Sequence, residues 1–233
     1  MDNFNGYTSY DSQSDAQDRV QDITVKTFMY MFFALMVSGF FAFVTYATGN
    51  AEEMISNGTI VILIVVELIS VIVTTILVRK NLPAAAAVCG TIYCIVNGLT
   101  LSVIFLVYEM QSIVAIFFVT AAIFGAMAFY GAKTKKDLTS IGSLCYMALI
   151  GIIVMTFVNI LFLKSEGLDL ALSYVGVLIF VGITAYDTQR IRKLATSDNG
   201  MSPYSIAILC ALNLYLDFIN LFLKLLRIFA RNR

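Results

Sequence analysis

The sequence lacks histidine entirely. Histidine is the commonest metal ligand, and its ordinary pKa lies closer to neutrality than that of any other side chain. Its absence therefore excludes a histidine metal centre and a histidine proton switch. Any response of this protein to pH near neutrality must come from carboxyl groups in unusual surroundings.

Charge is also scarce and evenly balanced. Charged residues make up 13% of the 233 residues, with 15 Lys plus Arg against 15 Asp plus Glu. A nucleic-acid-binding domain needs a clear excess of positive charge, so we expect no nucleic-acid partner. Hydrophobic residues make up 60% of the chain, whereas a soluble domain contains about 45 to 50%. Water cannot be the main solvent of this chain.

Cysteine is present only inside apolar runs, at Cys89, Cys94, Cys145 and Cys210. No two of these residues have the C-x-x-C spacing of a metal or redox motif. Free cysteine in such surroundings behaves as a small hydrophobic side chain. We therefore expect neither a disulfide nor a structural metal, and no cofactor.

Seven long apolar runs dominate the rest of the sequence. A helix of roughly 20 apolar residues spans the hydrocarbon core of a bilayer, which is about 30 Å thick. The runs cover residues 25–48, 59–78, 84–108, 111–130, 141–163, 170–188 and 204–229, to within a few residues. The sequence therefore predicts an all-α integral membrane protein, a bundle of seven transmembrane helices over residues 24–233.

Residues 1–23 differ from this domain in composition. They combine polar residues and glycine with five aspartates, Asp2, Asp11, Asp15, Asp18 and Asp22. Such a segment cannot bury enough apolar surface to fold alone, so we predict a disordered acidic tail. The first apolar run is long and follows acidic residues, which is atypical of a cleaved signal peptide.

Lysine and arginine alternate between the connecting segments. They occur before the first span and after the second, fourth and sixth spans, whereas the other loops contain only Lys164. Positive residues favour the cytoplasmic side, so the N-terminus is predicted to be cytoplasmic. Seven crossings then place the C-terminus outside although it carries four cations. The last span could instead re-enter, but we favour a full crossing because earlier loops dominate topology.

Three ionisable residues within the spans require an explanation, because a charge at the bilayer centre costs about 2.5 to 3.5 kcal/mol on insertion scales. They are Glu67 in the second span, Asp187 in the sixth and Asp217 in the seventh. Glu67 could form part of a polar pathway or an interhelical hydrogen bond in its protonated form. Asp187 could equally mark the cytoplasmic end of its span beside Arg190.

Asp187 and Asp217 lie on consecutive antiparallel spans. Counted from the loop near residue 199, their depths differ by about 6 residues, or roughly 9 Å of helix rise. Side chains and an asymmetric loop can absorb that difference. The two carboxyl groups are therefore predicted to meet inside the bundle.

The last span carries a polar stripe made of Asn213, Asp217, Asn220 and Lys224. Their spacings of four, three and four residues place them on one face of a helix. Lipid chains cannot form hydrogen bonds with these polar side chains. The stripe should therefore line the protein interior or a water-filled cavity. The stripe is a candidate ion path, although asparagines can also simply join helices by hydrogen bonds.

Three segments resemble the transmembrane Bax inhibitor motif family, also called the Bax inhibitor-1-like family. They are AYDTQRIRKL (185–194), ALNLYLDFINLFLKLLRIF (211–229) and AFYGAKTKKDL after the fourth span, and the similarity extends from about residue 20. The resemblance indicates a bacterial member in the plasma (inner) membrane. It implies a seven-helix fold in which the C-terminal helix is central.

The resemblance also implies a function. Family members are calcium leak pathways gated by pH through two hydrogen-bonded aspartates, which correspond to Asp187 and Asp217. An arginine of the second span is described as a latch onto the first of these, and Arg79 is the only matching arginine. The aspartates would serve as pH sensor and as transient calcium ligands.

Elementary electrostatics supports this mechanism independently. Two carboxylates held close in a low-dielectric setting repel, so one of them retains a proton more readily than in water. Once both are ionised, they repel each other and offer the hard oxygen ligands that Ca²⁺ prefers. The resemblance, supported by this argument, implies a pH-sensitive calcium leak channel that interacts with the bilayer, calcium and protons. We expect it to be monomeric and not an enzyme.

Two other functions fit parts of the sequence. The protein could modulate a membrane-bound protease through its acidic tail without conducting ions. It could also be an intramembrane aspartyl protease, since Tyr186 and Asp187 form a Tyr-Asp pair. That enzyme class requires G-x-G-D on the next span, whereas Leu214, Tyr215 and Leu216 precede Asp217, so the enzyme hypothesis is weak.

Overall fold

The computed structural model describes the backbone of residues 4–230 and the side chains from residue 15 onward. Within the described part every regular element is a helix. The elements are α1 (Phe4–Ala47), α2 (Asn50–Ser56), α3 (Thr59–Arg79), α4 (Pro83–Leu101), α5 (Ile104–Val107), α6 (Met110–Lys133), α7 (Thr139–Val158), the π-helix η1 (Asn159–Leu163), α8 (Glu166–Thr196) and α9 (Pro203–Phe229).

The seven predicted spans are confirmed as seven helices long and apolar enough to cross a membrane. Five of them are α1 from Asp15, α3, α6, α8 and α9. The third span combines α4 with the short α5, and the fifth combines α7 with η1. The large side chains that face outward from these helices are mostly apolar, as contact with lipid requires.

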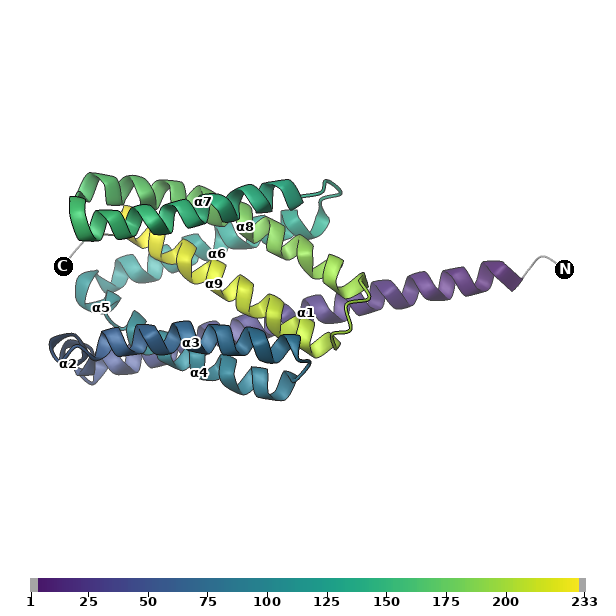
Figure 1. Cartoon of the computed structure of the whole chain (residues 1–233), viewed down its shortest axis with the longest axis horizontal. Coiled ribbons are helices and arrows are strands. Elements are labelled where there is room, and N and C mark those ends of the chain that lie inside the picture. Colours follow the sequence, from purple (N-terminus) through teal and green to yellow (C-terminus); the bar gives the residue numbers. More distant parts are fainter. Residues whose placement is uncertain (1–3, 231–233) are drawn as a thin grey trace.

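Helix α1 includes most of the N-terminal segment for which the composition predicts a disordered tail. Residues 4–23 belong to α1, whose first part extends beyond the other helices (Figure 1), whereas Ile23 is already buried in the core. Residues 1–3 lie outside the described part of the chain. Extending an existing helix avoids the costly nucleation step, which is why a polar segment joined to a long apolar helix can remain helical. The predicted boundary at residue 24 is therefore a change of composition within one helix.

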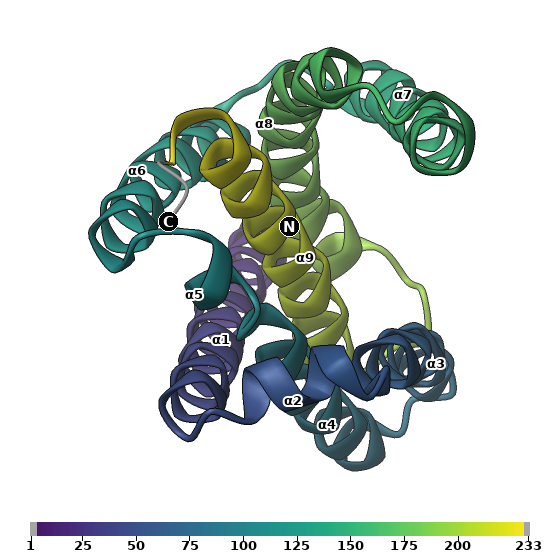
Figure 2. The same ribbon diagram turned by 90° about the vertical axis from the view of Figure 1, so that its left-hand side faces the viewer.

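Helix α9 lies between two groups of helices, with α6, α7 and α8 on one side and α1, α3 and α4 on the other (Figures 1 and 2). It packs against α1, α3, α4, α6 and α8. Most of its side chains are buried, and Leu214, Tyr215, Leu221 and Leu226 are fully so. The polar stripe occupies one face of this helix, where Asp217 is buried and Asn213, Asn220 and Lys224 are partly exposed.

Two close helix contacts fix how these groups pack. A Cβ atom at Gly98 of α4 would lie 2.6 Å from the carbonyl oxygen of Ser38 on α1. A Cβ atom at Gly131 of α6 would overlap the carbonyl oxygen of Ala185 on α8. Small residues at such points let helix backbones approach closely, which is how helices associate in lipid, where no hydrophobic force drives them together.

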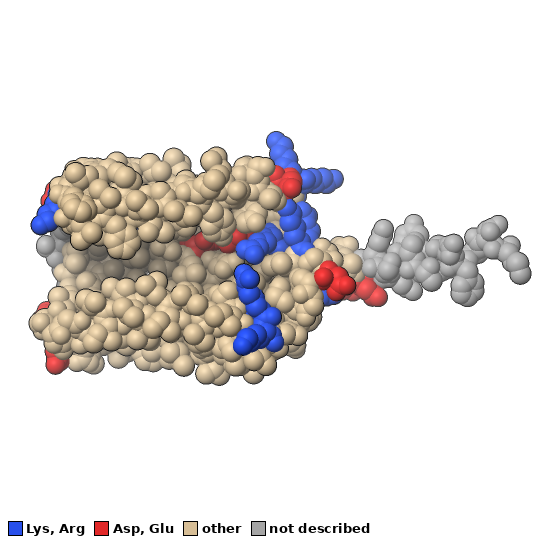
Figure 3. Space-filling model, in the orientation of Figure 1, with Lys and Arg blue, Asp and Glu red and all other residues tan. Residues whose placement is uncertain are grey.

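The two ends of the bundle differ in charge. Lysine and arginine gather at the end where α1 enters the bundle, and the sides between the ends are almost free of charge on the face shown (Figure 3). Helix α9 runs without interruption from that end to the opposite one (Figure 1), as a full last crossing requires. The cation-rich end is the one that the sequence predicts to be cytoplasmic.

Candidate functional site

A cavity of about 420 Å³ lies between α7, α8 and α9. Most of its lining is apolar, and its polar side chains come from all three helices. They are Tyr146 of α7, Thr156 of α7, Asp187 of α8, and Asn213, Asp217, Asn220 and Lys224 of α9. Figure 3 shows acidic side chains in a hollow between the two groups of helices, away from both ends of the bundle. The structure thus brings both predicted aspartates and the whole polar stripe to one cavity.

Asp187 sits near the C-terminal end of α8 and is only 3% exposed. The hydroxyl group of Tyr146 donates to its carboxylate, at 3.2 Å from Oδ1 and 3.0 Å from Oδ2. Arg190, one helical turn further along, interacts electrostatically with the same carboxylate. Burial disfavours the ionised form of this carboxyl group, whereas the hydrogen bonds and the nearby cation favour it.

Helix α7 is held in place to make this contact. The Tyr186 ring lies directly over Gly142, where a Cβ atom would overlap it, and Cys145 packs against Gly182. The rings of Tyr146 and Tyr186 meet edge to face, with centroids 6.1 Å apart. Sequence reasoning did not identify Tyr146, because a single tyrosine in an apolar span carries no pattern that distinguishes it from an interfacial tyrosine.

Asp217 lies deeper in its helix than Asp187 does and is only 5% exposed. Its Oδ2 atom is buried and has no hydrogen-bond partner. The carboxyl group is close enough to Asp187 to interact with it electrostatically. Burying a carboxyl oxygen without a hydrogen-bond partner costs free energy. Two neighbouring carboxyl groups can offset that cost by sharing a proton or by binding a cation together.

Lys224 ends the polar stripe two helical turns from Asp217, roughly 10 Å along the axis. Its aliphatic stem packs against Gly176 of α8, where a Cβ atom would lie only 3.1 Å from the stem. Among the described residues Lys224 forms no ion pair, whereas the nearby Arg227 pairs with Asp169. The cavity therefore has an acidic part and a separate basic end.

Glu67 belongs to a different network. Its carboxylate accepts hydrogen bonds from the hydroxyl group of Thr100 and from Nδ2 of Asn97, the latter at 3.3 Å. The hydroxyl group of Tyr215 donates to Oδ1 of Asn97 at 2.7 Å. These bonds join α3, α4 and α9 on the side of α9 away from the aspartates. The structure thus places Glu67 in an interhelical network, outside the aspartate cavity.

Arg79 is not brought to the aspartates. It is exposed at the C-terminal end of α3, and it forms no ion pair with any described carboxylate. Helix α3 packs mainly against α4, with smaller contacts to α9. The cation next to Asp187 in this structure is Arg190. An Arg79 latch onto Asp187 is therefore not formed here.

The described residues contain no cluster of three or more acidic or cysteine side chains that could hold a metal ion. Ca²⁺ takes six to eight oxygen ligands, so two carboxylates alone form a weak site. The amide oxygens of Asn213 and Asn220 and water would have to complete the coordination. Weak coordination suits an ion in transit better than a resident ion.

Comparison with known proteins gives a consistent result. The family described as "Inhibitor of apoptosis-promoting Bax1" matches residues 20–233. The chain is 42% identical to inner membrane protein YbhL of Escherichia coli (strain K12) over 233 residues, which cover 95% of this chain and 97% of that protein. An uncharacterized membrane protein of Streptococcus pyogenes serotype M1 is 42% identical over 168 residues, 72% of each chain. An uncharacterized protein of Borreliella burgdorferi is 37% identical over 212 residues, 89% of this chain and 91% of the relative.

Proposed function

Because the chain belongs to the Bax inhibitor-1-like family, we propose that it is a pH-sensitive calcium leak channel rather than an enzyme. One observation carries the proposal. Asp187 and Asp217, from consecutive spans, line one cavity within the membrane bundle, and Oδ2 of Asp217 is buried there without a hydrogen-bond partner. Ionisable residues inside a membrane bundle characteristically mark ion or proton pathways.

The protonation state of the pair supplies the switch. With one proton shared between them, the two carboxyl groups attract each other and the contact between α8 and α9 is maintained. When that proton is lost, two negative charges in a low-dielectric cavity repel strongly and attract a divalent cation. A rise in pH therefore opens the path and supplies calcium with oxygen ligands in the same step.

Other groups of the cavity have distinct parts in this mechanism. Tyr146 holds the Asp187 carboxylate from the side of α7, so that α7 moves with α8. Asn213 and Asn220 extend the polar path on either side of Asp217 along α9. Lys224 repels cations at the far end of the cavity, which confines the ion contact to the acidic part.

The proposed location is the inner membrane of a bacterium, with the N-terminus in the cytoplasm. The name of the Escherichia coli relative supports the membrane. The clustering of lysine and arginine at the end where α1 enters supports the orientation. We propose that the protein acts there as a monomer, with calcium as the transported ion and no cofactor.

Calcium entry into proteoliposomes loaded with a calcium-sensitive dye tests this function. The parent protein should produce a leak above that of empty liposomes, and the leak should increase between about pH 6 and pH 8 as the shared proton is lost. Purified protein that elutes as a single species and remains helical, yet gives no leak at any pH, would contradict the proposal.

A second function is favoured by one observation, the projection of α1 beyond the other helices (Figure 1). A projecting acidic segment is a suitable contact for another membrane machine, such as a membrane-bound protease. Deletion of residues 1–20 separates the two functions. The deletion should abolish modulation of a partner while leaving the calcium leak intact if the two roles are independent.

A further inference from the structure

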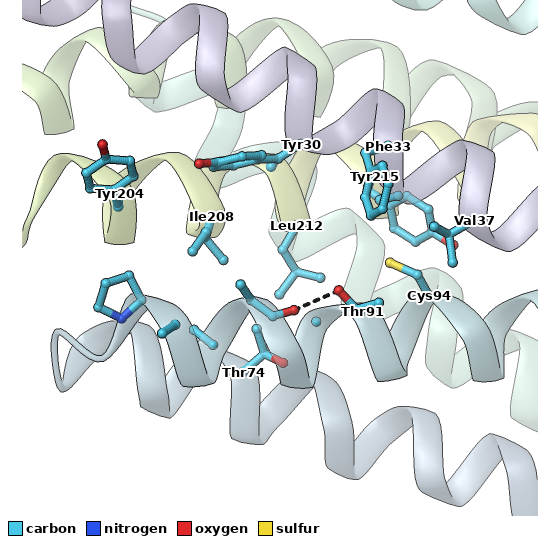
Figure 4. A pocket seen from close by; sticks show the side chains of 17 residues that line it. Tyr30, Phe33, Val37, Thr74, Thr91, Cys94, Tyr204, Ile208, Leu212 and Tyr215 are labelled. Atoms are coloured by element: carbon cyan, nitrogen blue, oxygen red, sulfur yellow. Dashed lines mark hydrogen bonds between the residues drawn. The ribbon is translucent and has the colours of Figure 1, made fainter.

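A second cavity, of about 460 Å³, lies on the other side of α9 from the aspartates, between α1, α4 and α9 (Figure 4). Tyr30, Phe33 and Val37 of α1 form one wall, and Ile208, Leu212 and Tyr215 of α9 form another. Its volume is in the range of ligand-binding cavities, about 300 to 1,000 Å³. None of the residues assigned to the calcium path lines it.

The cavity exists because of how α1 and α4 cross. The two helices touch where Gly98 meets Ser38, and no side chain could be inserted at that point. Closer to Pro83, α4 presents small side chains to α1, including Ala84, Ala87 and Gly90. A Cβ atom at Gly90 would meet only Thr74, at 3.7 Å. The close contact at one end and small residues at the other leave a wedge of space.

The polar groups on the walls do not require a polar ligand. Thr91 donates to the carbonyl oxygen of Ala87 at 2.9 Å (Figure 4), and Thr74 donates to that of Ser70 at 2.8 Å. The hydroxyl group of Tyr215 is bonded to Asn97. Because the hydroxyl groups of Thr74, Thr91 and Tyr215 are already bonded, these walls favour an apolar occupant.

The mouth of the cavity has a different character. Tyr30 and Tyr204 lie there (Figure 4), and Nζ of Lys26 sits 4.5 Å from the centre of the Tyr204 ring while also pairing with Asp22. Arg79 and Lys80 lie in the turn that leads to Pro83. Neither forms an ion pair with a described carboxylate. Tyrosine and cations at this position match the interface between lipid chains and headgroups.

The loop that carries these cations is fixed against α9. Oδ1 of Asn81 accepts hydrogen bonds from the backbone N–H of Ser202 at 2.8 Å and from the hydroxyl group of Ser205 at 3.0 Å. The turn between α3 and α4 is thereby tied to the start of α9, where Tyr204 lies. The two cations Arg79 and Lys80 therefore keep a defined position relative to the mouth.

We propose that this cavity is a binding site for one acyl chain of a phospholipid with an anionic headgroup, drawn from the leaflet at the cation-rich end. Cys94, which is buried, follows Pro83 by 11 positions on α4, roughly 16 Å of helix rise. That distance is about half of the 30 Å hydrocarbon core, the length available to a chain in one leaflet. The cations hold the headgroup, and the apolar walls hold the chain. This site is independent of the proposed calcium function.

The absence of tryptophan from the chain allows a direct test. Phe33→Trp places a single fluorophore on the cavity wall, and Phe32→Trp places one on the adjacent position, which does not line the cavity. The two positions have similar exposure, 60% and 66%, so they differ chiefly in their relation to the cavity. Each full-length variant is reconstituted in phosphatidylcholine vesicles containing a minor fraction of lipid brominated on its acyl chains. Bromine quenches tryptophan only when the chain lies against it.

Phosphatidylglycerol and phosphatidylcholine are compared as the brominated lipid. At Phe33→Trp the apparent association of phosphatidylglycerol should be at least about threefold stronger, and that preference should be lost in Arg79→Gln/Lys80→Gln. At Phe32→Trp the preference should be clearly smaller. Equal quenching by the two lipids at Phe33→Trp would overturn the proposal.

Filling the cavity supplies the matched control. Ala87 and Val88 are both exposed, but only Ala87 lines the cavity. Ala87→Phe therefore adds a ring within the cavity, and Val88→Phe adds one outside it. In the Phe33→Trp background, Ala87→Phe should remove the preference and Val88→Phe should leave it. A preference that survives Ala87→Phe would show that the lipid binds outside this cavity and would overturn the proposal.

Discussion

The hydroxyl group of Tyr146 on α7 lies 3.0 Å from Oδ2 of Asp187 on α8 and donates a hydrogen bond to that carboxylate. This bond stabilises the ionised form of Asp187 at the edge of the cavity that also contains Asp217. It connects α7, which otherwise packs chiefly on α8, to the proposed switch.

Tyr146→Phe removes this bond while keeping the ring. Because the ionised carboxylate loses a donor, deprotonation should require a higher pH, and the midpoint of the calcium leak should move upward by about half to one pH unit. The pH profile of flux in proteoliposomes measures this shift. Tyr174→Phe, on an exposed tyrosine of α8, is the control and should leave the midpoint unchanged. A midpoint that stays in place in Tyr146→Phe would remove Tyr146 from the mechanism.

Gly131→Ala tests the close contact of α6 with α8. The added methyl group would overlap the carbonyl oxygen of Ala185, so the helices must separate, and the free energy of unfolding should fall by about 1 to 3 kcal/mol. Gly125→Ala on the same helix has nothing within 4 Å and should be neutral or stabilising by up to about 1 kcal/mol. Unfolding in mixed detergent micelles measures both, and equal effects would show that the α6–α8 contact is looser than described.

Tyr215→Phe tests the network of Glu67, Asn97 and Thr100. Without the hydroxyl group, Oδ1 of Asn97 loses its bonded donor inside the bundle, and the free energy of unfolding should fall by about 0.5 to 2 kcal/mol. The same detergent unfolding assay applies, with Tyr130→Phe at an exposed position as the control. Because this network lies outside the aspartate cavity, the pH midpoint of the leak should not change. A shifted midpoint would show that Glu67 takes part in the switch.

The loop between α6 and α7 offers a test of pH-dependent stability. Hydrogen bonds from Lys193, at 2.5 Å, and from Thr139 hold the pKa of Asp137 well below its usual range. A lowered pKa stabilises the folded state above the unfolded value, near 4, and this stabilisation is lost as pH falls through the folded value. Asp137→Asn should therefore lower Tm slightly at pH 7, and the difference should shrink at acid pH below 4. Because the ion pair between Asp137 and Lys193 is exposed, high salt should also reduce this difference in Tm. A difference independent of pH would contradict this interpretation.

The sequence was sufficient to predict the seven spans, because an apolar run of this length is stable in a bilayer as a transmembrane helix. The polar stripe of α9 was also predictable, since helical spacing alone places Asn213, Asp217, Asn220 and Lys224 on one face. The meeting of Asp187 with that stripe required only the antiparallel order of the last two spans. These inferences depend on local periodicity and on consecutive helices.

Contacts between helices distant in sequence were not predictable in the same way. The partners of Glu67 are 30 and 33 residues away, and Tyr146 is 41 residues from Asp187. Such pairs depend on helix rotation and crossing, which close contacts such as Gly131 with Ala185 determine. The environment of Arg79 at the end of α3 depends on helix rotation in the same way, and span order alone does not reveal it.

The pairing of Asp187 with Asp217 is the central claim, and calcium flux into dye-loaded proteoliposomes between pH 6 and pH 8 tests it most directly. The parent protein is compared with Asp187→Asn, Asp217→Asn and the double variant. If the two carboxyl groups share one proton, each single variant should abolish the pH dependence, and the double variant should add little because the residues act as a unit. A parent-like pH dependence in both single variants, or the absence of flux from folded parent protein, would contradict the account.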